Sequence, residues 1–376
     1  MNTYQTKRLP NTRVDVADAL RGIAVAGIIL FHSVEHFNVF TQEAITHTLS
    51  FDKTVYDVMS WLLSGKMYGI FAMLFGLSFF IMNDNQQQKG KSFSGRFAWR
   101  MCLLLVFGLV NTAFYDGDIL VTYAILGMFL IPCSYLPSKA VWCIVGLLAI
   151  QPIELFSLLT GWEMNTDTLW ATFGKMGEVH QHGGFLDCVA INLHYGFYAD
   201  VLYFIYTGRL TQILALFILG MLLGRHRFFY DEGRHLHYWR IIFGIAVSLV
   251  VAGSIVKFGT LDKLLNPIYN LCILMMIVSG VVLIWYASRG ARGTLEHLCV
   301  YGRMSLTNYL IQSVVGSFVF CGYGLACYRH IGTAYALLVG VVMVGAQYVF
   351  CRCWFRSHSR GPLEGLWRKL TWIRKS

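Results

Sequence analysis

The chain has few charged residues and only six prolines. Asp, Glu, Lys and Arg make up 13% of its 376 residues, against about 25% in soluble domains. Hydrophobic residues make up 56%, and the mean hydropathy is +0.55. This balance excludes a soluble globular enzyme. It predicts an all-α, polytopic membrane protein with no soluble domain of useful size.

Several motif classes are also absent. We find no glycine-rich phosphate loop, fixed-period repeat or low-complexity tail. The ten cysteines lack the paired spacing of a zinc site, so no metal is predicted. Cys188 and Cys327 are both expected on the outer side, which leaves a disulfide or two free thiols open. No small-x-small cleavage site follows the first apolar run, Gly22 to Phe31, so we expect an uncleaved span.

Apolar stretches recur along the chain, and each is long enough to cross a bilayer as a helix of about 20 residues. They predict ten spans, at 17–38, 55–82, 97–115, 119–136, 140–160, 204–224, 240–258, 266–288, 303–324 and 334–354. The connecting segments alternate between rich and poor in Lys and Arg, which predicts that both termini are cytoplasmic. The net charge of +10 is therefore interpreted as a topology signal rather than a nucleic-acid patch. We expect a multi-pass protein of the inner (cytoplasmic) membrane.

Two segments outside the spans have distinct patterns. The outer loop, 161–203, is long and mixes aromatic with polar residues, as binding loops do. Residues 361–373 predict a C-terminal interfacial helix, whose lipid-facing residues are expected to be Leu363, Leu366, Trp367 and Leu370. Spans and connections together form a single integral membrane domain over residues 1–376.

The first span carries ionisable groups that an anchor does not need. Arg21 and His32 are eleven positions apart, so on a helix they share one face at a separation of about 16 Å. Glu35 and His36 continue this face. Histidine suits acid–base catalysis near neutral pH, and Glu35 is near enough to orient an imidazole. The alternative is that Glu35 and His36 only cap the span at the interface.

Other polar residues in the first two spans are candidate ligands of an anion. Arg21 is interpreted as a cation for a phosphate or diphosphate. The alternative is that Asp18 and Arg21 form a local pair that anchors the inner end of the span. Lys66 lies between Gly65 and Gly69, and it either faces the protein interior or extends outward to the interface.

Two further pairs of polar residues lie near the ends of later spans. Asp116 and Asp118 are either solvated turn residues or acids at the depth of His32. Asn308 and Gln312 lie on one face of the ninth predicted span. They either hydrogen-bond a neighbouring helix or donate to a developing oxyanion.

Four stretches of the chain resemble a known family. They are DALRGIA at 18–24, GDIL at 117–120 followed by Tyr123-Ala124, GRMSLTNYLIQS at 302–313, and GPLEGLWR at 361–368. The pattern is similar to the YeiB-like family of bacterial membrane proteins (domain of unknown function 418), from Asp15 to about Thr371. The resemblance implies kinship with transmembrane acyltransferases, including acyltransferase family 3 and heparan glucosaminide acetyltransferase. Those enzymes pass an acyl group from cytoplasmic acyl-CoA to a sugar on the far side.

His32 departs from the YeiB-like pattern, which usually has Asn at this place. An arginine and a histidine separated by ten residues are instead the signature of acyltransferase family 3, where the histidine is the proposed catalytic base. This second resemblance implies a catalytic role for His32.

Together with these residues, the two resemblances imply a membrane-embedded acyltransferase. It is expected to move an acyl group, first of all acetyl, from cytoplasmic acetyl-CoA to a hydroxyl or amine of an extracytoplasmic sugar or glycan. Catalytic roles are expected for His32, Glu35, His36, Asn308 and Gln312. Donor binding is expected of Asp18, Arg21, Lys66 and Arg303, and acceptor binding of Asp116, Asp118, Trp162 and His194. Membrane lipid is the expected surrounding, nucleic acid is not an expected partner, and a homodimer is left open.

The alternative function is a proton-coupled transporter. In that case His32, Glu35 and His36 would form a proton relay. The sequence shows no inverted repeat and no matched pair of Gly- or Pro-broken spans in two halves, which are typical of transporters.

Overall fold

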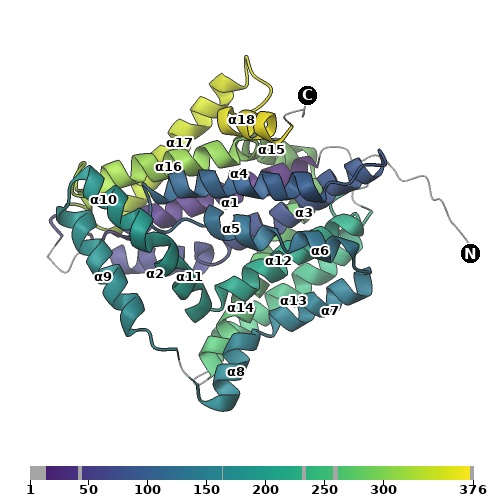
Figure 1. The fold of residues 1–376 in the computed structure, drawn as a ribbon, viewed down its shortest axis with the longest axis horizontal. Coiled ribbons are helices and arrows are strands. Elements are labelled where there is room, and N and C mark those ends of the chain that lie inside the picture. Colours follow the sequence, from purple (N-terminus) through teal and green to yellow (C-terminus); the bar gives the residue numbers. More distant parts are fainter. Residues whose placement is uncertain (1–13, 41–44, 163, 231–233, 257–260, 373–376) are drawn as a thin grey trace, which may run out of the picture.

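The computed structural model describes residues 14–40, 45–162, 164–230, 234–256 and 261–372 (Figure 1). Within these residues the regular structure is helical, apart from an isolated parallel β-bridge between His47 and Ile331. The predicted all-α class is confirmed.

Eighteen α-helices are present among the described residues. In chain order they are α1 (Asp15–Val34), α2 (Asp52–Leu63), α3 (Met67–Gln87), α4 (Ser94–Thr112), α5 (Leu120–Gly127), α6 (Leu130–Tyr135), α7 (Ser138–Ala149), α8 (Pro152–Thr160), α9 (Asp167–His182), α10 (Phe185–Ile191), α11 (Phe197–Tyr206), α12 (Arg209–Arg225), α13 (Leu236–Ile255), α14 (Asp262–Ala287), α15 (Arg289–Gly302), α16 (Ser305–Phe320), α17 (Thr333–Trp354) and α18 (Pro362–Thr371).

Six helical segments in the described part are long and apolar enough to cross a membrane. They are Asp15–Val34, Asp52–Gln87, Phe185–Tyr206, Leu236–Ile255, Leu264–Ala287 and Thr333–Trp354, and α7 with α8 makes a seventh if this pair, bent by 48°, is one span. The predicted ten spans are not confirmed, since α12 and α16 have only 17 and 16 residues. Residues 1–13 and 373–376, which hold the termini expected in the cytoplasm, lie outside the described residues.

Backbone turns break three of the predicted spans. Segment 55–82 divides into α2 and α3 where Gly65 has a φ of 78°. Segment 119–136 divides into α5 and α6, and Pro132 in α6 has no N–H to continue a helical ladder back to α5. Segment 140–160 bends at Gln151, whose φ is 57°, and Pro152 then begins α8. Mean hydropathy detects none of these turns.

The segment 161–203 is not a loop. It contains α9, α10, a π-helical turn at Asn192–Gly196 and most of α11. Met176 on α9 packs against Ile191 and Ala199, which gives this helical layer a small core of its own. The interpretation as a loop was wrong because polar residues between the aromatics concealed their helical spacing.

Helix α1 is the centre of the bundle and packs against α3, α15, α16 and α17 (Figure 1). Its contact with α15 depends on two glycines. A Cβ atom at Gly22 would lie 2.3 Å from the Leu298 carbonyl oxygen, and one at Gly302 would lie 2.0 Å from that of Asp18. The two backbones therefore touch, as small residues allow between membrane helices. This contact fixes the Asp18–Gly22 turn beside the start of α16.

Helix α18 confirms the helix predicted at 361–373, but part of its apolar face turns inward. The Arg100 guanidinium lies over the Trp367 ring at 3.4 Å, and the indole N–H donates to the Arg100 carbonyl at 3.2 Å. Leu363 packs against the main core, whereas Leu366 is exposed. The expectation that Leu363 and Trp367 face lipid was wrong, because α18 docks on α4 and α16 instead.

Glu364 ties α18 to the first turn of α16. Its carboxylate accepts hydrogen bonds from the N–H groups of Leu306 (2.8 Å) and Thr307 (3.0 Å) and from the Thr307 hydroxyl (2.7 Å). The N–H groups in a first turn have no partner within the helix, and the positive end of the helix dipole favours a carboxylate there. Glu364 thus joins the two C-terminal motifs, 302–313 and 361–368.

Removal of this carboxylate should destabilise the fold. Glu364→Ala is expected to lower the free energy of unfolding by about 1–2 kcal/mol, the usual cost of a lost helix cap. Glu364→Gln should lose less, since its amide oxygen still accepts. The measurement is denaturant unfolding in detergent, with Glu296→Ala as a control, because the Glu296–Arg292 pair is exposed and contributes little. Equal stability of Glu364→Ala and the wild type would contradict the capping role.

Candidate functional site

Two large cavities lie at opposite ends of α1, and both have walls from α1, α3 and α16. The basic cavity, about 1160 Å³, includes Arg21, Ser78 and Arg303 in its lining. The His32 cavity, about 1040 Å³, includes His32, Glu35 and Tyr309. Arg21 and His32, predicted on one helix face, therefore serve two different cavities.

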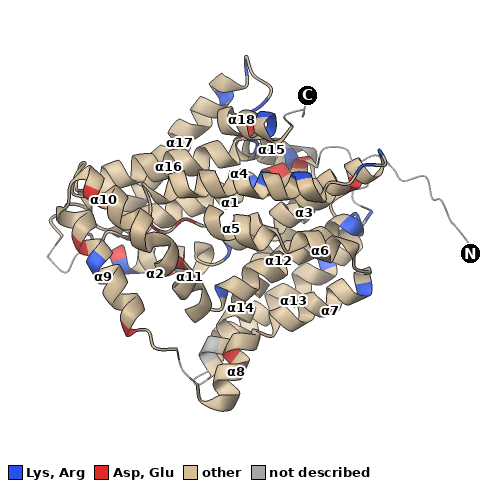
Figure 2. Cartoon of the chain, viewed as in Figure 1, with Lys and Arg blue, Asp and Glu red and all other residues tan. Residues whose placement is uncertain are grey.

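The basic cavity has a strong excess of positive charge. Its basic lining residues are Arg21, Lys89, Lys91, Arg96, Arg100, Arg303, Arg360 and Arg368, and its acidic ones are Asp18 and Glu364. Figure 2 shows Lys and Arg at the end of the bundle where α1 begins and α18 lies, with others at the opposite end near α9. Both acids already bind protein groups, Asp18 the guanidinium of Arg21 and Glu364 the start of α16. The cavity thus suits a ligand with several negative charges.

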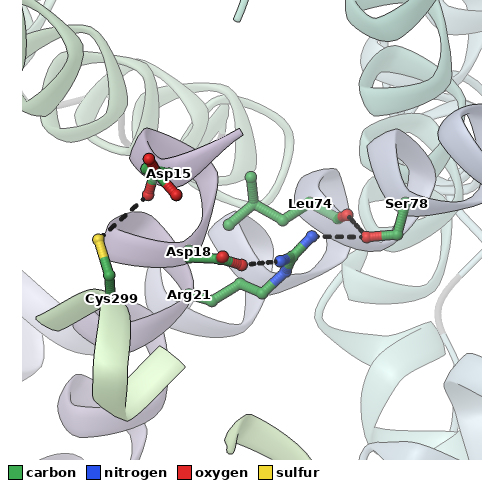
Figure 3. A network of polar contacts seen from close by, with 6 residues as sticks. All are labelled: Asp15, Asp18, Arg21, Leu74, Ser78 and Cys299. Carbon is green, nitrogen blue, oxygen red and sulfur yellow. Dashed lines mark hydrogen bonds and ion pairs between the residues drawn. The ribbon is translucent and has the colours of Figure 1, made fainter. Parts of the chain in front are cut away.

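Arg21 is held in place by two side chains (Figure 3). Its guanidinium forms an ion pair with Asp18 and donates to the Ser78 hydroxyl at 2.7 Å. That hydroxyl in turn donates to the Leu74 carbonyl at 2.6 Å. The predicted neighbours Asp18 and Arg21 do meet, and both line the cavity. Sequence reasoning missed Ser78, because a single serine in an apolar helix usually bonds only its own backbone.

Three lining arginines of the basic cavity lie over aromatic rings. The pairs, with the distance from guanidinium carbon to ring centre, are Arg100 and Trp367 (3.4 Å), Arg96 and Trp372 (4.3 Å), and Arg303 and Phe355 (4.4 Å). Stacking fixes the plane of a guanidinium without using its N–H groups. The arrangement is therefore suited to phosphate oxygens, and Arg303 is one of the arginines that line this cavity.

Lys66 is not in the basic cavity. It lies just before α3 at the end near His32, whereas Ser78 and the basic cavity lie further along that helix. Its side chain is buried, as one of the two alternatives predicted, and its ammonium lies 3.5 Å from the Ser60 carbonyl. Lys66 therefore lies away from the basic cavity, and its expected role in donor binding stays a prediction.

His32 faces the second cavity from the last turn of α1. Its ring centre lies 4.7 Å from that of Tyr115 and 5.8 Å from that of Phe37. Glu35 lines the same cavity, and Gln312 on α16 neighbours the imidazole. His32 Nδ1 and both polar atoms of the Gln312 side chain are buried. None of the three has a described partner at normal hydrogen-bond distance and angle. The cavity thus contains an imidazole available for proton transfer.

His36 and Asn308 do not line the His32 cavity. His36 has a φ of 51°, and its Nε2 lies 2.9 Å from the Ile331 carbonyl oxygen. Asn308 is fully buried and donates to the Tyr301 carbonyl at 3.2 Å. Both side chains bind the protein itself, so the structure places neither where the predicted catalytic role requires it.

Asp116 and Asp118 have different environments. Asp116 lines the His32 cavity and accepts a hydrogen bond from the Asn38 amide at 3.2 Å. Asp118 is outside the cavity lining and accepts from the Asn111 amide at 2.8 Å and the Val121 N–H at 2.9 Å, which stabilises the start of α5. Burial raises the pKa of both carboxyl groups, that of Asp118 to about 7. Of the two carboxyl groups, that of Asp116 faces the His32 cavity.

Trp162 and His194 were expected to bind the acceptor, but they line other pockets. Trp162 is half-exposed beside α8 in a pocket of about 190 Å³. His194 is exposed on the π-helical turn, in an open pocket of about 770 Å³. The segment folds into helices that distribute its aromatic residues over different faces, so acceptor binding by these two residues stays a prediction apart from the His32 cavity.

Several residues that line the His32 cavity were not predicted as site residues from the sequence. Helix α9 contributes one face, with Trp170, Phe173, Gly174, Gly177, Glu178, Gln181 and His182, and α11 and α12 contribute Asp200, Tyr203, Phe204 and Arg209. The α9 residues recur at helical spacing. This spacing was the signal that could have shown that 167–182 is a helix with one face toward the cavity.

The disulfide left open by the sequence is not formed. Cys188 and Cys327 are both free thiols. The Cys188 thiol instead donates to the Val179 carbonyl, with a sulfur–oxygen distance of 3.4 Å.

A family profile matches the C-terminal part of the chain. The family described as "Protein of unknown function (DUF418)" matches residues 223–374. This region, called the DUF418 region below, is similar to that family. The DUF418 region contributes Arg303, Arg360 and α18 to the basic cavity, and Tyr309 to the His32 cavity. Helix α1, with Arg21 and His32, lies before the matched residues.

Full-length relatives extend the similarity beyond the DUF418 region. The "Uncharacterized protein YxaH" of Bacillus subtilis (strain 168) is 28% identical over 396 residues, which cover 97% of this chain and 96% of that protein. The "Uncharacterized protein YeiB" of Escherichia coli (strain K12) is 23% identical, over 94% of this chain and 95% of its own. The predicted resemblance to YeiB is confirmed. No solved structure matches the chain.

Proposed function

We propose that this protein is a membrane-embedded acyltransferase that takes an acyl group, first of all acetyl, from coenzyme A. The observation that carries the proposal is the pairing of a basic cavity and a histidine-lined cavity at the two ends of α1. Coenzyme A carries a diphosphate and a further phosphate, which match a lining of eight basic and two acidic residues. The acceptor is a hydroxyl or amine of an extracytoplasmic sugar or glycan, and it occupies the His32 cavity.

The chemistry follows from these positions. With the phosphates beside Arg21, the pantetheine arm extends between α1, α3 and α16 toward His32. His32 accepts a proton from the acceptor as the acceptor's oxygen or nitrogen attacks the thioester carbonyl carbon. The carbon–sulfur bond breaks, and the CoA thiolate leaves and takes up a proton. The Gln312 amide neighbours the imidazole, although it lines neither cavity, and it is the candidate donor to the oxyanion.

Aromatic side chains mark the boundary between the cavities on α3. Tyr68 lines the His32 cavity, and one turn on Phe71 lines the basic cavity. The Tyr123 ring lies 6.1 Å from that of Phe71, and its hydroxyl donates to the Tyr68 carbonyl at 2.5 Å. In the proposed reaction the donor's arm passes these rings, so they must shift when acetyl-CoA binds.

Acetyl-CoA binding to the detergent-purified full chain tests the proposal. We expect saturable binding by calorimetry and transfer of labelled acetyl to a glycan fraction. Acetyl-pantetheine is the matched probe, because it keeps the thioester but lacks the nucleotide phosphates, and it should bind much more weakly. Absence of saturable acetyl-CoA binding to monodisperse protein would contradict the proposal.

A proton-coupled transporter is the second candidate. A cavity at each end of α1 is also compatible with a substrate path across a membrane. The proposed relay is incomplete, however, because His36 bonds to the Ile331 carbonyl outside the His32 cavity. Uptake into proteoliposomes driven by a pH gradient, together with absence of CoA binding, would favour this candidate.

Two glycines on α9 provide a test of acceptor access. Gly174 and Gly177 line the His32 cavity, and a Cβ atom at either would meet no atom within 4 Å. Packing therefore does not require them, although glycine inside a helix costs about 1 kcal/mol relative to alanine. Gly177→Ala is expected to raise the free energy of unfolding by up to about 1 kcal/mol and to lower kcat/KM for the acceptor by narrowing the cavity.

The matched control is Gly345→Ala on α17. A Cβ atom there also meets nothing within 4 Å, and Gly345 lies outside both cavity linings. It should raise stability without a change in kcat/KM. Equal kinetic parameters for Gly177→Ala and Gly345→Ala would show that no acceptor approaches this part of α9.

A further inference from the structure

Arg209 begins α12 and lines the His32 cavity with its guanidinium between two tyrosines. The guanidinium carbon lies 5.0 Å from the Tyr203 ring centre and 5.5 Å from that of Tyr68. Its hydrogen bond to the Ser64 hydroxyl is long, at 3.4 Å. The stacked rings orient the guanidinium plane and leave most of its five N–H donors unused.

Arg209 forms no ion pair within the described part of the chain. The pairs found there join Arg21 with Asp18, Lys53 with Asp57, and Arg292 with Glu296. Glu35 attracts Arg209 electrostatically but lies beyond ion-pair distance, and the buried Lys66 ammonium repels it. A guanidinium in the protein interior is costly unless an anion meets it. An oxyanion with two oxygens in one plane would satisfy it in a bidentate manner.

We propose that Arg209 forms an anion subsite of the His32 cavity, and that the acceptor carries a carboxylate or phosphate group besides its acylated hydroxyl or amine. That the bound anion is the acyl acceptor rests on the proposed function, whereas the presence of an anion subsite does not. The acids of the lining, Glu35, Asp116, Glu178 and Asp200, supply oxygens that can accept hydrogen bonds from hydroxyls of the same molecule. The subsite thus selects an anionic sugar over a neutral one.

Calorimetry on the wild-type chain with glucose, glucuronate and glucose 6-phosphate tests this subsite. We expect the better anionic sugar to bind about ten-fold or more tightly than glucose, as one charge-assisted bidentate contact allows. Tighter binding of glucuronate assigns the anion as a carboxylate, and tighter binding of glucose 6-phosphate assigns it as a phosphate. Equal affinity of all three sugars, or failure of both anionic sugars to bind, would overturn the proposal.

Variants identify the residue. Arg209→Gln should lose the preference for the anionic sugar, and Arg209→Lys should keep part of it, because it retains the charge but not the planar fork. Arg329→Gln is the control, since Arg329 is exposed and outside the cavity lining. If Arg209→Gln is not monodisperse, the Arg209→Lys variant decides the comparison. An unchanged preference in the folded variant would exclude Arg209 as the subsite.

The two proposals fail separately. Anion binding that depends on Arg209, without any acetyl-CoA binding, would refute the acyltransferase and retain the subsite. Acetyl transfer with no preference between glucose and its anionic derivatives would refute the anion subsite and retain the acyltransferase.

Discussion

His32→Ala is expected to reduce acetyl transfer by about a hundred- to ten-thousand-fold, the usual contribution of a general base. Its acetyl-CoA affinity should stay near the wild-type value, because His32 lines the cavity opposite the one assigned to the donor. Single-turnover transfer and calorimetry on the same preparation measure the two effects. A His32→Ala protein that transfers acetyl at the wild-type rate would refute the assigned base.

His36→Ala is the matched control for this variant. It removes an imidazole four residues away that lies outside the cavity and bonds to the Ile331 carbonyl. We expect a loss of stability of about 1 kcal/mol from that hydrogen bond and wild-type transfer per folded molecule. If the two histidine variants lost activity equally, a proton relay would explain the data better than a single base.

Arg21→Ala should instead weaken acetyl-CoA binding, by about ten-fold or more for one charged hydrogen bond to a phosphate. The rate of transfer at saturating donor should change less, since Arg21 is far from the reacting carbon. Asp18→Asn keeps the guanidinium and its bond to Ser78, so it should lose less affinity than Arg21→Ala. Donor titrations by calorimetry compare the variants.

The control for the donor site is Arg292→Ala, because Arg292 is exposed and outside the basic cavity. It should bind acetyl-CoA as the wild type does. Unchanged binding by Arg21→Ala would show that the Asp18–Arg21 pair only anchors the start of α1, the alternative that the sequence left open.

The sequence predicted those parts of the site that depend on one helix alone. The apolar run from Gly22 to Phe31 predicts α1, and helical spacing then fixes Asp18 beside Arg21 and His32 beyond them on one face. These relations follow from 3.6 residues per turn and need no knowledge of neighbouring helices. They are also the relations that the structure confirms.

The sequence did not predict which side chains would meet partners distant in the chain. His36 bonds to a carbonyl 295 residues away, so nothing local distinguishes it from His32. Hydropathy did not detect the break at Gly65, which puts Lys66 just before α3 and outside the basic cavity. Arg209 attracted no notice, since one arginine at a span end is typical of an anchor and only Tyr68 and Tyr203 show its orientation.

Because one continuous helix contributes to both cavities, they cannot respond to ligands independently if α1 moves as a unit. A shift of α1 along its axis would carry Arg21 and His32 together and so change both cavities at once. Linkage then requires reciprocity: whatever factor a bound donor applies to acceptor affinity, a bound acceptor applies to donor affinity. The contact of Gly22 and Gly302 with facing backbone sets how far such a shift can go. The order in which donor and acceptor bind would accordingly leave the stability of the ternary complex unchanged.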